Sequence, residues 1–321
     1  MACREFYYLL PVLVLITVSL SLQIHGSKLS PDYYSRTCPK ALSIVKEGVI
    51  AAIKNETRMG ASLLRLHFHD CFVNGCDGSV LLDDNATFTG EKTALPNNGS
   101  IRGFGVVDHI KAELEKACPR VVSCADILAI AARDSVVYLG GPSWVVRLGR
   151  RDSLTANRTA ANVFIPAPTL NLSALNSSFA VQGLSFKDMV ALSGSHTIGF
   201  ARCVSFRARI YNDTDINASF ANSLKKKCPV SENNNVLQGL DYQTPFYFDN
   251  DYYGNLLVKK GLLHSDQELY NGNAADYLVK RFTKHSSDFF NDFATAMVKM
   301  GNIRPLTGKK GEIRVNCRKA D

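Results

Sequence analysis

Apolar side chains recur every three to four residues along most of this chain, and alternation of apolar and polar positions is confined to short runs. The first spacing is typical of amphipathic helices, which bury one face against a core. It predicts helices over residues 41–55, 60–71, 103–117, 124–139, 172–182, 186–192, 199–211, 218–227, 249–260, 274–284 and 286–300. Strand-like runs are few and short, such as residues 144–148 and 312–315.

Helix boundary signals agree with this pattern. Ser185 directly precedes one predicted helix, and Gly183 directly follows another, as capping residues commonly do. Residues 157–170 contain Pro166 and Pro168, so we expect an extended connection that joins two halves of the fold. The chain is therefore predicted to be mainly α.

The length and composition are those of a globular protein. The chain has 321 residues, of which 46% are hydrophobic and 21% are charged. That length is sufficient for one large domain or two closely packed halves, each with a buried core. The composition is not that of a fibrous or disordered chain.

The first residues have the pattern of a secretory signal peptide. Arg4 precedes an apolar stretch over residues 7–22, and polar residues follow. The alternative is a membrane anchor, but the apolar run is short for a span of about 20 residues. We expect a cleaved signal over residues 1–27 and a mature domain over 28–321, with no membrane span.

The cysteines and glycosylation sequons agree with export. One of the nine cysteines, Cys3, lies in the expected signal, and the other eight make an even set for an oxidising compartment. Their spacing does not by itself select a pairing, and no C-x-x-C pair suggests zinc. Sequons for N-glycosylation occur at Asn55, Asn85, Asn98, Asn157, Asn171, Asn176, Asn212 and Asn217.

The net charge of +8 and the pI of about 9.0 restrict the macromolecular partners. Nucleic acid and an acidic extracellular polymer are the two candidates. The basic residues are scattered, and the densest run, Lys225–Lys227, resembles a solvated helix end. No nucleic-acid-binding motif is present. We therefore expect no nucleic acid partner, and an anionic wall polysaccharide is the better candidate.

Chemistry is concentrated on the helix predicted over residues 60–71. Arg65 and His69 are four residues apart and lie on one face, with Phe68 beside them. Histidine moves protons near neutral pH, and arginine stabilises a developing negative charge. For an isolated pair of this kind, an ordinary packed helix is the better explanation. A zinc site with His67 is the other alternative, but positions two apart on a helix face in different directions.

The loop after this helix has the ligands that a hard cation prefers. Asp70, Asp77 and Ser79 accompany Gly75 and Gly78. Carboxylate, hydroxyl and carbonyl oxygens are typical calcium ligands, although the spacing is not that of an EF-hand.

The motifs together resemble a known family. The segment LRLHFHDCFVNGCDGS at residues 64–79 resembles the distal haem helix and calcium loop of the secreted class III plant peroxidases, the horseradish peroxidase type. The resemblance extends from about Leu29 to Cys317. It includes SCADILA at 123–129, ALSGSHTIG at 191–199, LDYQTPFYFDND at 240–251 and SDQEL at 265–269.

The resemblance implies a haem peroxidase fold, in which two helical halves with few short strands enclose one haem b. It implies that His196 is the axial iron ligand, and that Asp266 accepts a hydrogen bond from its other ring nitrogen. On the opposite side, Arg65, His69 and Asn97 would be catalytic.

The same resemblance implies two calcium sites and the disulfide pairing. The first site would use Asp70, Val73, Gly75, Asp77 and Ser79, with Glu91 linking it to the catalytic network. The second would use Thr197, Asp241, Thr244, Tyr247 and Asp249. The implied disulfides are Cys38–Cys118, Cys71–Cys76, Cys124–Cys317 and Cys203–Cys228, and the implied structural ion pair is Asp126 with Arg150.

The activity implied by the resemblance is the reduction of hydrogen peroxide to water, coupled to one-electron oxidation of small phenolic donors. Such chemistry serves lignin and cell-wall cross-linking and the response to oxidative stress. Pro166 would help to hold the donors, and Leu95 lies where some members have an aromatic residue. Because only four residues follow Cys317, we expect a secreted protein, extracellular or bound to the cell wall, that acts as a monomer.

Three other interpretations remain open at this point. The chain could be a secreted glycoprotein without activity that only binds wall polysaccharide. It could be a zinc hydrolase, which metal analysis would reveal. It could be an intracellular ascorbate-type peroxidase, although the cysteines, sequons and expected signal argue against that location.

Overall fold

A computed structural model describes residues 29–321 of the chain. The expected signal peptide over 1–27 lies outside the described residues. None of the helices within 29–321 combines the length and apolar character that crossing a bilayer requires.

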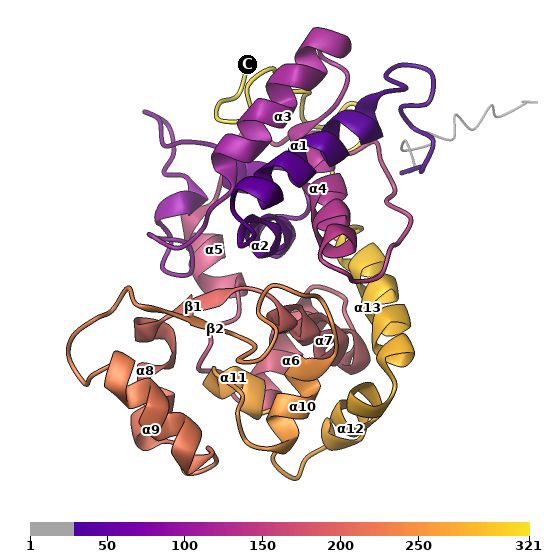
Figure 1. Ribbon diagram of the computed structural model, residues 1–321. Helices are drawn as coiled ribbons and strands as arrows, with labels where there is room; N and C mark the ends of the chain where they lie inside the picture. The colour runs from indigo at the N-terminus through magenta and orange to yellow at the C-terminus, as the bar shows by residue number, and fades with distance from the viewer. Residues whose placement is uncertain (1–28) are drawn as a thin grey trace, which may run out of the picture.

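The helices form two halves, one above the other in Figure 1. In the upper half, α2 packs against α1 and α4, and α3 packs against α1 and α4. The capping side chain of Ser123 accepts the backbone N–H of Asp126 and begins α4, whose residues are almost all buried. The upper elements are α1 (Ala41–Asn55), α2 (Met59–Cys71), η1 (Ser79–Leu81), η2 (Glu91–Thr93), α3 (Phe104–Ala117) and α4 (Cys124–Tyr138).

The lower half contains the remaining helices and one small sheet. Helix α7 packs against α6 and α13, and α10 packs against α12. The lower helices are α6 (Leu172–Val181), α7 (Phe186–Ser193), η3 (Gly194–Thr197), α8 (Cys203–Asn212), α9 (Ala218–Lys227), α10 (Asp251–Leu257), α11 (His264–Gln267), α12 (Asp276–Lys284) and α13 (Ser286–Met300). Strands β1 (Phe200–Arg202) and β2 (Leu237–Gly239) pair antiparallel where the two halves meet in Figure 1.

The mainly α prediction is correct, and so are most of the helix positions. The prediction of an extended segment over 157–170 was wrong in part, because α5 (Arg158–Phe164) forms there. The side chain of Asn157 accepts the backbone N–H of Ala160 and so begins this helix, a cap signal that the two prolines obscured. Pro166 and Pro168 follow its end.

The strand predictions were also wrong in detail. Residues 144–148 and 312–315 make only isolated bridges, Ser30 with Leu148 and Asp152 with Glu312. The first residues of the helix predicted over 199–211 instead form β1, because their backbone groups pair with β2 from a distant part of the chain. Periodicity over a short run does not reveal such a partner.

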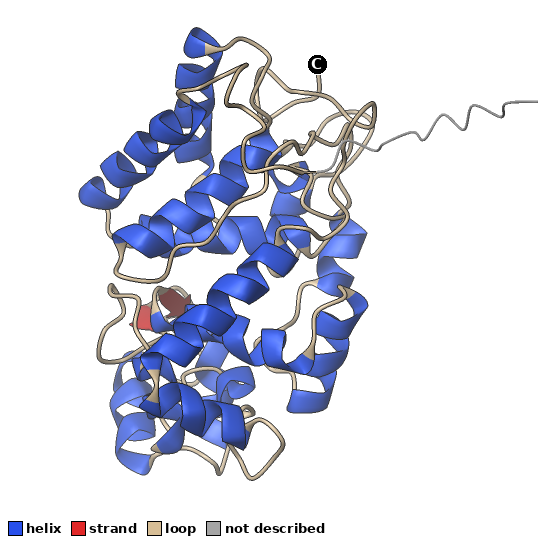
Figure 2. Cartoon of the chain, turned by 90° about the vertical axis from the view of Figure 1, so that its right-hand side faces the viewer, coloured by secondary structure: helices blue, strands red, loops and turns tan. Residues whose placement is uncertain are grey.

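The end of the chain returns to the upper half. After α13, residues 301–321 run as loops beside α4, and Figure 2 shows loops gathered around the C-terminus. The disulfide Cys124–Cys317 joins this segment to the start of α4. The other disulfides are Cys38–Cys118, Cys71–Cys76 and Cys203–Cys228, so the four pairs are those that the resemblance implies.

Candidate active site

Helix α2 places Arg65 and His69 in direct contact. The Nε of Arg65 donates to Nε2 of His69 at 3.0 Å, as their four-residue spacing predicts. The other guanidinium nitrogens donate to the carbonyl of Pro96 at 2.7 Å and to the carbonyl of Ser100 at 3.1 Å. Burial lowers the pKa of Arg65 to about 10, so the side chain remains a cation at neutral pH.

A hydrogen-bond relay fixes the ring of His69. Its Nδ1 lies 2.5 Å from Oδ1 of Asn97, and Nδ2 of Asn97 donates to the backbone carbonyl of Glu91 at 2.9 Å. Because that amide nitrogen is already a donor, Oδ1 is the acceptor and Nδ1 of His69 carries the proton. Burial, and then the charge of Arg65, lower the pKa of His69 well below its ordinary value. The imidazole is therefore neutral, and its unprotonated Nε2, which here accepts the hydrogen bond of Arg65, can act as a base once that bond opens.

His196 lies in the lower half, in the 3₁₀ turn η3 that continues α7. Its Nδ1 lies 2.7 Å from Oδ1 of Asp266, which α11 supplies from 70 residues further along the chain. Asp266 is only 2% exposed, although nothing in its local sequence indicates burial. Its Oδ2 accepts the backbone N–H of Leu263 at 2.9 Å, which holds the carboxylate in place.

This arrangement suits a metal ligand. A metal-bound histidine commonly donates its second ring N–H to a carboxylate, which fixes the ring and raises the basicity of the ligating nitrogen. Within residues 29–321, Nε2 of His196 has no hydrogen-bond partner, and the side chain is about one-third exposed. The residues present therefore fit an iron held at Nε2.

The loop after α2 contains buried oxygens that lack partners. Asp70 and Asp77 face inward, where their carboxylates accept the backbone N–H groups of Gly78 and Ser79. Among the described residues, Oγ of Ser79 and Oε2 of Glu91 are buried without any hydrogen-bond partner. Polar atoms that are buried away from water normally have a hydrogen-bond partner. A bound cation would give these two oxygens a partner by coordinating them.

The raised pKa values of the carboxyl groups in this cluster also favour a cation site. Burial, and then the charge of Asp77, raise the pKa of Asp70 well above its ordinary value. Burial, with a smaller contribution from Asp77, also raises the pKa of Glu91 to about 8. The carbonyls of Val73 and Gly75, which the resemblance adds to the set, accept no hydrogen bond from the described residues. Several uncompensated carboxylates in one buried place suit a calcium ion.

A similar cluster lies next to His196. Thr197 donates its hydroxyl to Oδ1 of Asp249 at 2.9 Å. Oδ2 of Asp241 and Oγ1 of Thr244 are buried and unpaired within the described chain, and Tyr247 closes the turn by donating its N–H to the carbonyl of Thr244. Contacts therefore link Thr197 with Asp249, and Asp241 and Tyr247 with Thr244, within the set of five residues that the resemblance implies for a second cation.

The remaining residues are His67, from the zinc alternative, and Pro166 and Leu95, from the expected donor-binding region. His67 lies beside the disulfide Cys71–Cys76, at 3.6 Å from the sulfur of Cys71, and both sulfurs are consumed in that bond. No zinc site follows from this group. Pro166 is half-buried after α5, and Leu95 is 86% exposed, with its N–H bound to the side chain of Asn162 in α5.

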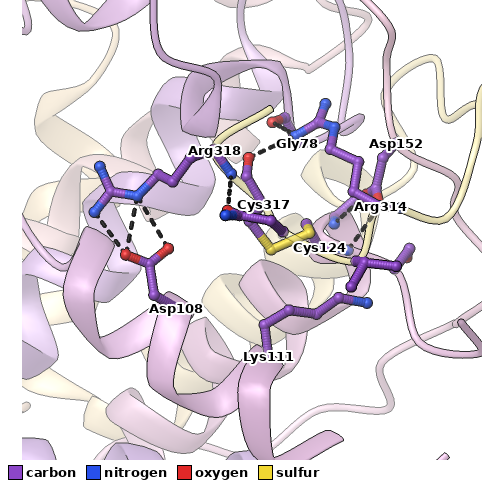
Figure 3. Close-up of a disulfide and its surroundings, with 12 residues drawn as sticks. Gly78, Asp108, Lys111, Cys124, Asp152, Arg314, Cys317 and Arg318 are labelled. Carbon is purple, nitrogen blue, oxygen red and sulfur yellow. Dashed lines mark hydrogen bonds and ion pairs between the residues drawn. A yellow bond between two sulfur atoms is a disulfide. The ribbon is translucent and has the colours of Figure 1, made fainter. Parts of the chain in front are cut away.

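Sequence reasoning missed one buried cation that supports the first cluster. Arg314, in the C-terminal segment, is fully buried and donates to the carbonyls of Gly78 and Cys317 (Figure 3). It also donates to the carbonyl of Ser153. Its backbone N–H also donates to Asp152, which caps the start of α4. A single arginine in a polar tail gives no sign of burial, so no local signal could have identified it.

The chain is similar to known proteins over nearly its whole length. A family model described as peroxidase matches residues 45–285. Peroxidase 70 of Zea mays is 60% identical over 310 residues, which cover 96% of each chain. Peroxidase 4 of Vitis vinifera is 60% identical over 298 residues, which cover 92% of this chain and 93% of that protein. Peroxidase RIP1 of Medicago truncatula is 58% identical over 313 residues, which cover 96% of each chain. The protein described here therefore belongs to the peroxidase family, as a class III plant haem peroxidase.

Proposed function

We propose that His69, Arg65 and Asn97 form the side of the haem site that cleaves peroxide. The observation that carries this proposal is the direction of the relay, in which Asn97 occupies Nδ1 of His69 and leaves Nε2 basic next to the guanidinium. The haem supplies the redox chemistry when bound, since it gives two electrons to peroxide and takes them back singly from two donor molecules.

His69 and Arg65 have complementary tasks in that reaction. Nε2 of His69 accepts the proton of one peroxide oxygen and returns it to the other, so that the second oxygen leaves as water. Arg65 stays charged and stabilises the negative charge that develops as the oxygen–oxygen bond breaks. Its two bonds to backbone carbonyls hold the guanidinium in position before peroxide arrives.

On the other side, His196 would hold the iron through Nε2. Asp266 would increase the basicity of that nitrogen by accepting the Nδ1 proton in a hydrogen bond. Both residues are placed by elements of the lower half, whereas His69 and Arg65 come from the upper half. The haem would therefore lie where the halves meet.

The donors that we propose are small phenols, held near Pro166 at the edge of the haem. Pro166 is half-buried and lies two residues after the end of α5, which carries the exposed apolar residues Val163 and Phe164. An apolar edge of this kind suits an aromatic ring. We further propose two calcium ions at the two clusters described above, and secretion to the cell wall, where the net charge of +8 favours anionic polysaccharide.

The decisive test removes the imidazole of His69, the proposed base, and leaves the proposed iron ligand His196 unchanged. We expect His69→Ala to react with hydrogen peroxide about 10²–10⁴ times more slowly, the range typical of general acid–base catalysis. The rate is measured by stopped-flow absorbance of the haem-loaded protein. His67→Gln, which changes an imidazole on another face of α2, is the control and should react at the parent rate. A His69→Ala variant as fast as the parent would show that the assignment is wrong.

A further inference from the structure

Asp266 has a second side-chain donor besides His196. Tyr252 donates its hydroxyl to Oδ1 of Asp266 at 3.1 Å, the same oxygen that lies 2.7 Å from Nδ1 of His196. The ring centroids of Tyr252 and His196 are 6.1 Å apart and meet edge to face. Tyr252 is buried, so this bond is shielded from bulk solvent. One carboxylate oxygen therefore serves two donors.

We propose that Tyr252 is a positioning residue that limits how strongly Asp266 draws the proton of His196. The inference rests on the proposed roles of His196 and Asp266. A carboxylate oxygen that accepts an additional hydrogen bond is a weaker base, because part of its charge is already stabilised. The Nδ1–H bond of His196 is then less polarised. Nε2 in turn donates less electron density to iron, which raises the reduction potential of the haem.

The groups around Tyr252 keep its hydroxyl protonated and in position to donate to Asp266. Burial, and then the charge of Asp266, raise the pKa of Tyr252 well above its ordinary value, so the phenol stays protonated and remains a donor. The start of α10 fixes its place, since the N–H of Asp251 donates to Oδ1 of Asp249 at 2.9 Å. Asp249 belongs to the second cation cluster, so that loop also determines where the hydroxyl lies.

The next residue provides a matched control. Tyr253 is on the same helix and is also fully buried, but its hydroxyl donates to the backbone carbonyl of Val190 at 2.9 Å. Replacing either tyrosine by phenylalanine removes one buried hydroxyl and preserves the ring. Only the change at Tyr252 removes a donor from Asp266.

The test compares Tyr252→Phe and Tyr253→Phe in the haem-loaded protein. We expect Tyr252→Phe to lower the equilibrium constant for one-electron reduction of the iron by three- to tenfold. At 59 mV per tenfold, the midpoint potential falls by about 28–59 mV. Spectroelectrochemistry measures this potential, and resonance Raman of the ferrous protein should show a higher iron–histidine stretching frequency. Tyr253→Phe should leave both values at those of the parent.

The inference is overturned if Tyr252→Phe leaves the potential unchanged, raises it, or shifts it no more than Tyr253→Phe does. Asp266→Asn separates this outcome from failure of the proposed function. That variant should raise the potential and lower the stretching frequency, because the amide is a much weaker acceptor. If Asp266→Asn has these effects and Tyr252→Phe has none, only the role of Tyr252 is wrong. If Asp266→Asn changes neither value, the assignment of His196 and Asp266 is itself wrong.

Discussion

At the scale of single residues, the groups that support the site are buried polar side chains. Among the described residues, the guanidinium of Arg314 has no carboxylate within hydrogen-bonding distance, and its nearest acidic oxygen, in Glu312, is 4.0 Å away. It instead donates to backbone carbonyls, of which that of Gly78 lies between the proposed ligands Asp77 and Ser79. The N–H of Gly78 donates to Asp70, the neighbour of His69. Arg314 thus connects the C-terminal segment to the catalytic helix.

We expect Arg314→Gln to destabilise the protein by about 1–3 kcal/mol, the cost of leaving buried polar groups unpaired. The shorter amide cannot reach the carbonyls of both Gly78 and Ser153. Denaturant unfolding of the two proteins measures the difference. Arg120→Gln is the control, because Arg120 is exposed and pairs with Asp321 in the same C-terminal segment. Equal stability of Arg314→Gln and Arg120→Gln would contradict this prediction.

At the scale of elements, α7, which η3 continues to His196, is held at its start. Ser185 and Asp188 form a capping box at the start of α7, and Asp188 also binds the ammonium of Lys299 on α13 at 2.8 Å. Burial acts to raise the pKa of Asp188, but the bonds from Lys299 and Ser185 outweigh it, and the net pKa is lowered. The charged carboxylate therefore contributes to the position of α7 against α13.

The lowered pKa of Asp188 predicts a pH dependence. Its contribution to stability is present above the pKa of an unfolded aspartate, about 3.9, and is lost as the pH falls through the lower folded pKa. We expect Asp188→Asn to cost about 1 kcal/mol at pH 7, the typical value of a helix cap, and nothing at a pH where the parent carboxyl is protonated. Unfolding midpoints at both pH values test this. Asp288→Asn, at a partly exposed pair with Arg281, should have a smaller effect at pH 7. A loss for Asp188→Asn that is independent of pH would refute the explanation.

Some helices and strands could be predicted from the local sequence, and others could not. The helices α1, α9 and α13 begin and end where periodicity predicts, because each has a continuous apolar face. Helix α11 has only four residues, too few for any period to appear, yet it supplies Asp266. The sheet of β1 and β2 pairs residues that are 35 to 39 positions apart in the chain, with Phe200 opposite Gly239 and Arg202 opposite Leu237. Short elements of this kind are stabilised by tertiary contacts with residues that are distant in the chain.

At the scale of the whole molecule, each half has its own proposed cation site next to a histidine. Asp70 adjoins His69 in the upper half, and Thr197 adjoins His196 in the lower half. Without a cation, the upper cluster leaves Glu91 with a pKa of about 8 beside two further carboxyls. Both ions would therefore stabilise the two walls between which haem is proposed to lie.

We expect the purified protein to contain two calcium ions per chain and to lose stability in excess chelator. A ligand present at 100 times its dissociation constant stabilises the folded state by about 2.7 kcal/mol, so the thermal midpoint should fall as calcium is removed. Metal analysis should find one ion in Asp77→Asn and one in Asp241→Asn. Asp83→Asn, at an exposed carboxylate outside the clusters, should keep both ions. Absence of calcium from the parent protein would disprove the two sites.

The sequence by itself determined the helical class and the family motifs, together with the side-by-side arrangement of Arg65 and His69. These follow from spacings of a few residues, which a helix converts directly into shared faces. It did not determine the burial of Asp266 and Arg314, the helix over Arg158–Phe164, or the hydroxyl of Tyr252 on Asp266. Those depend on contacts between segments far apart in the chain. Only the tertiary structure decides them, because a polar side chain is buried when a distant segment supplies its hydrogen-bond partner.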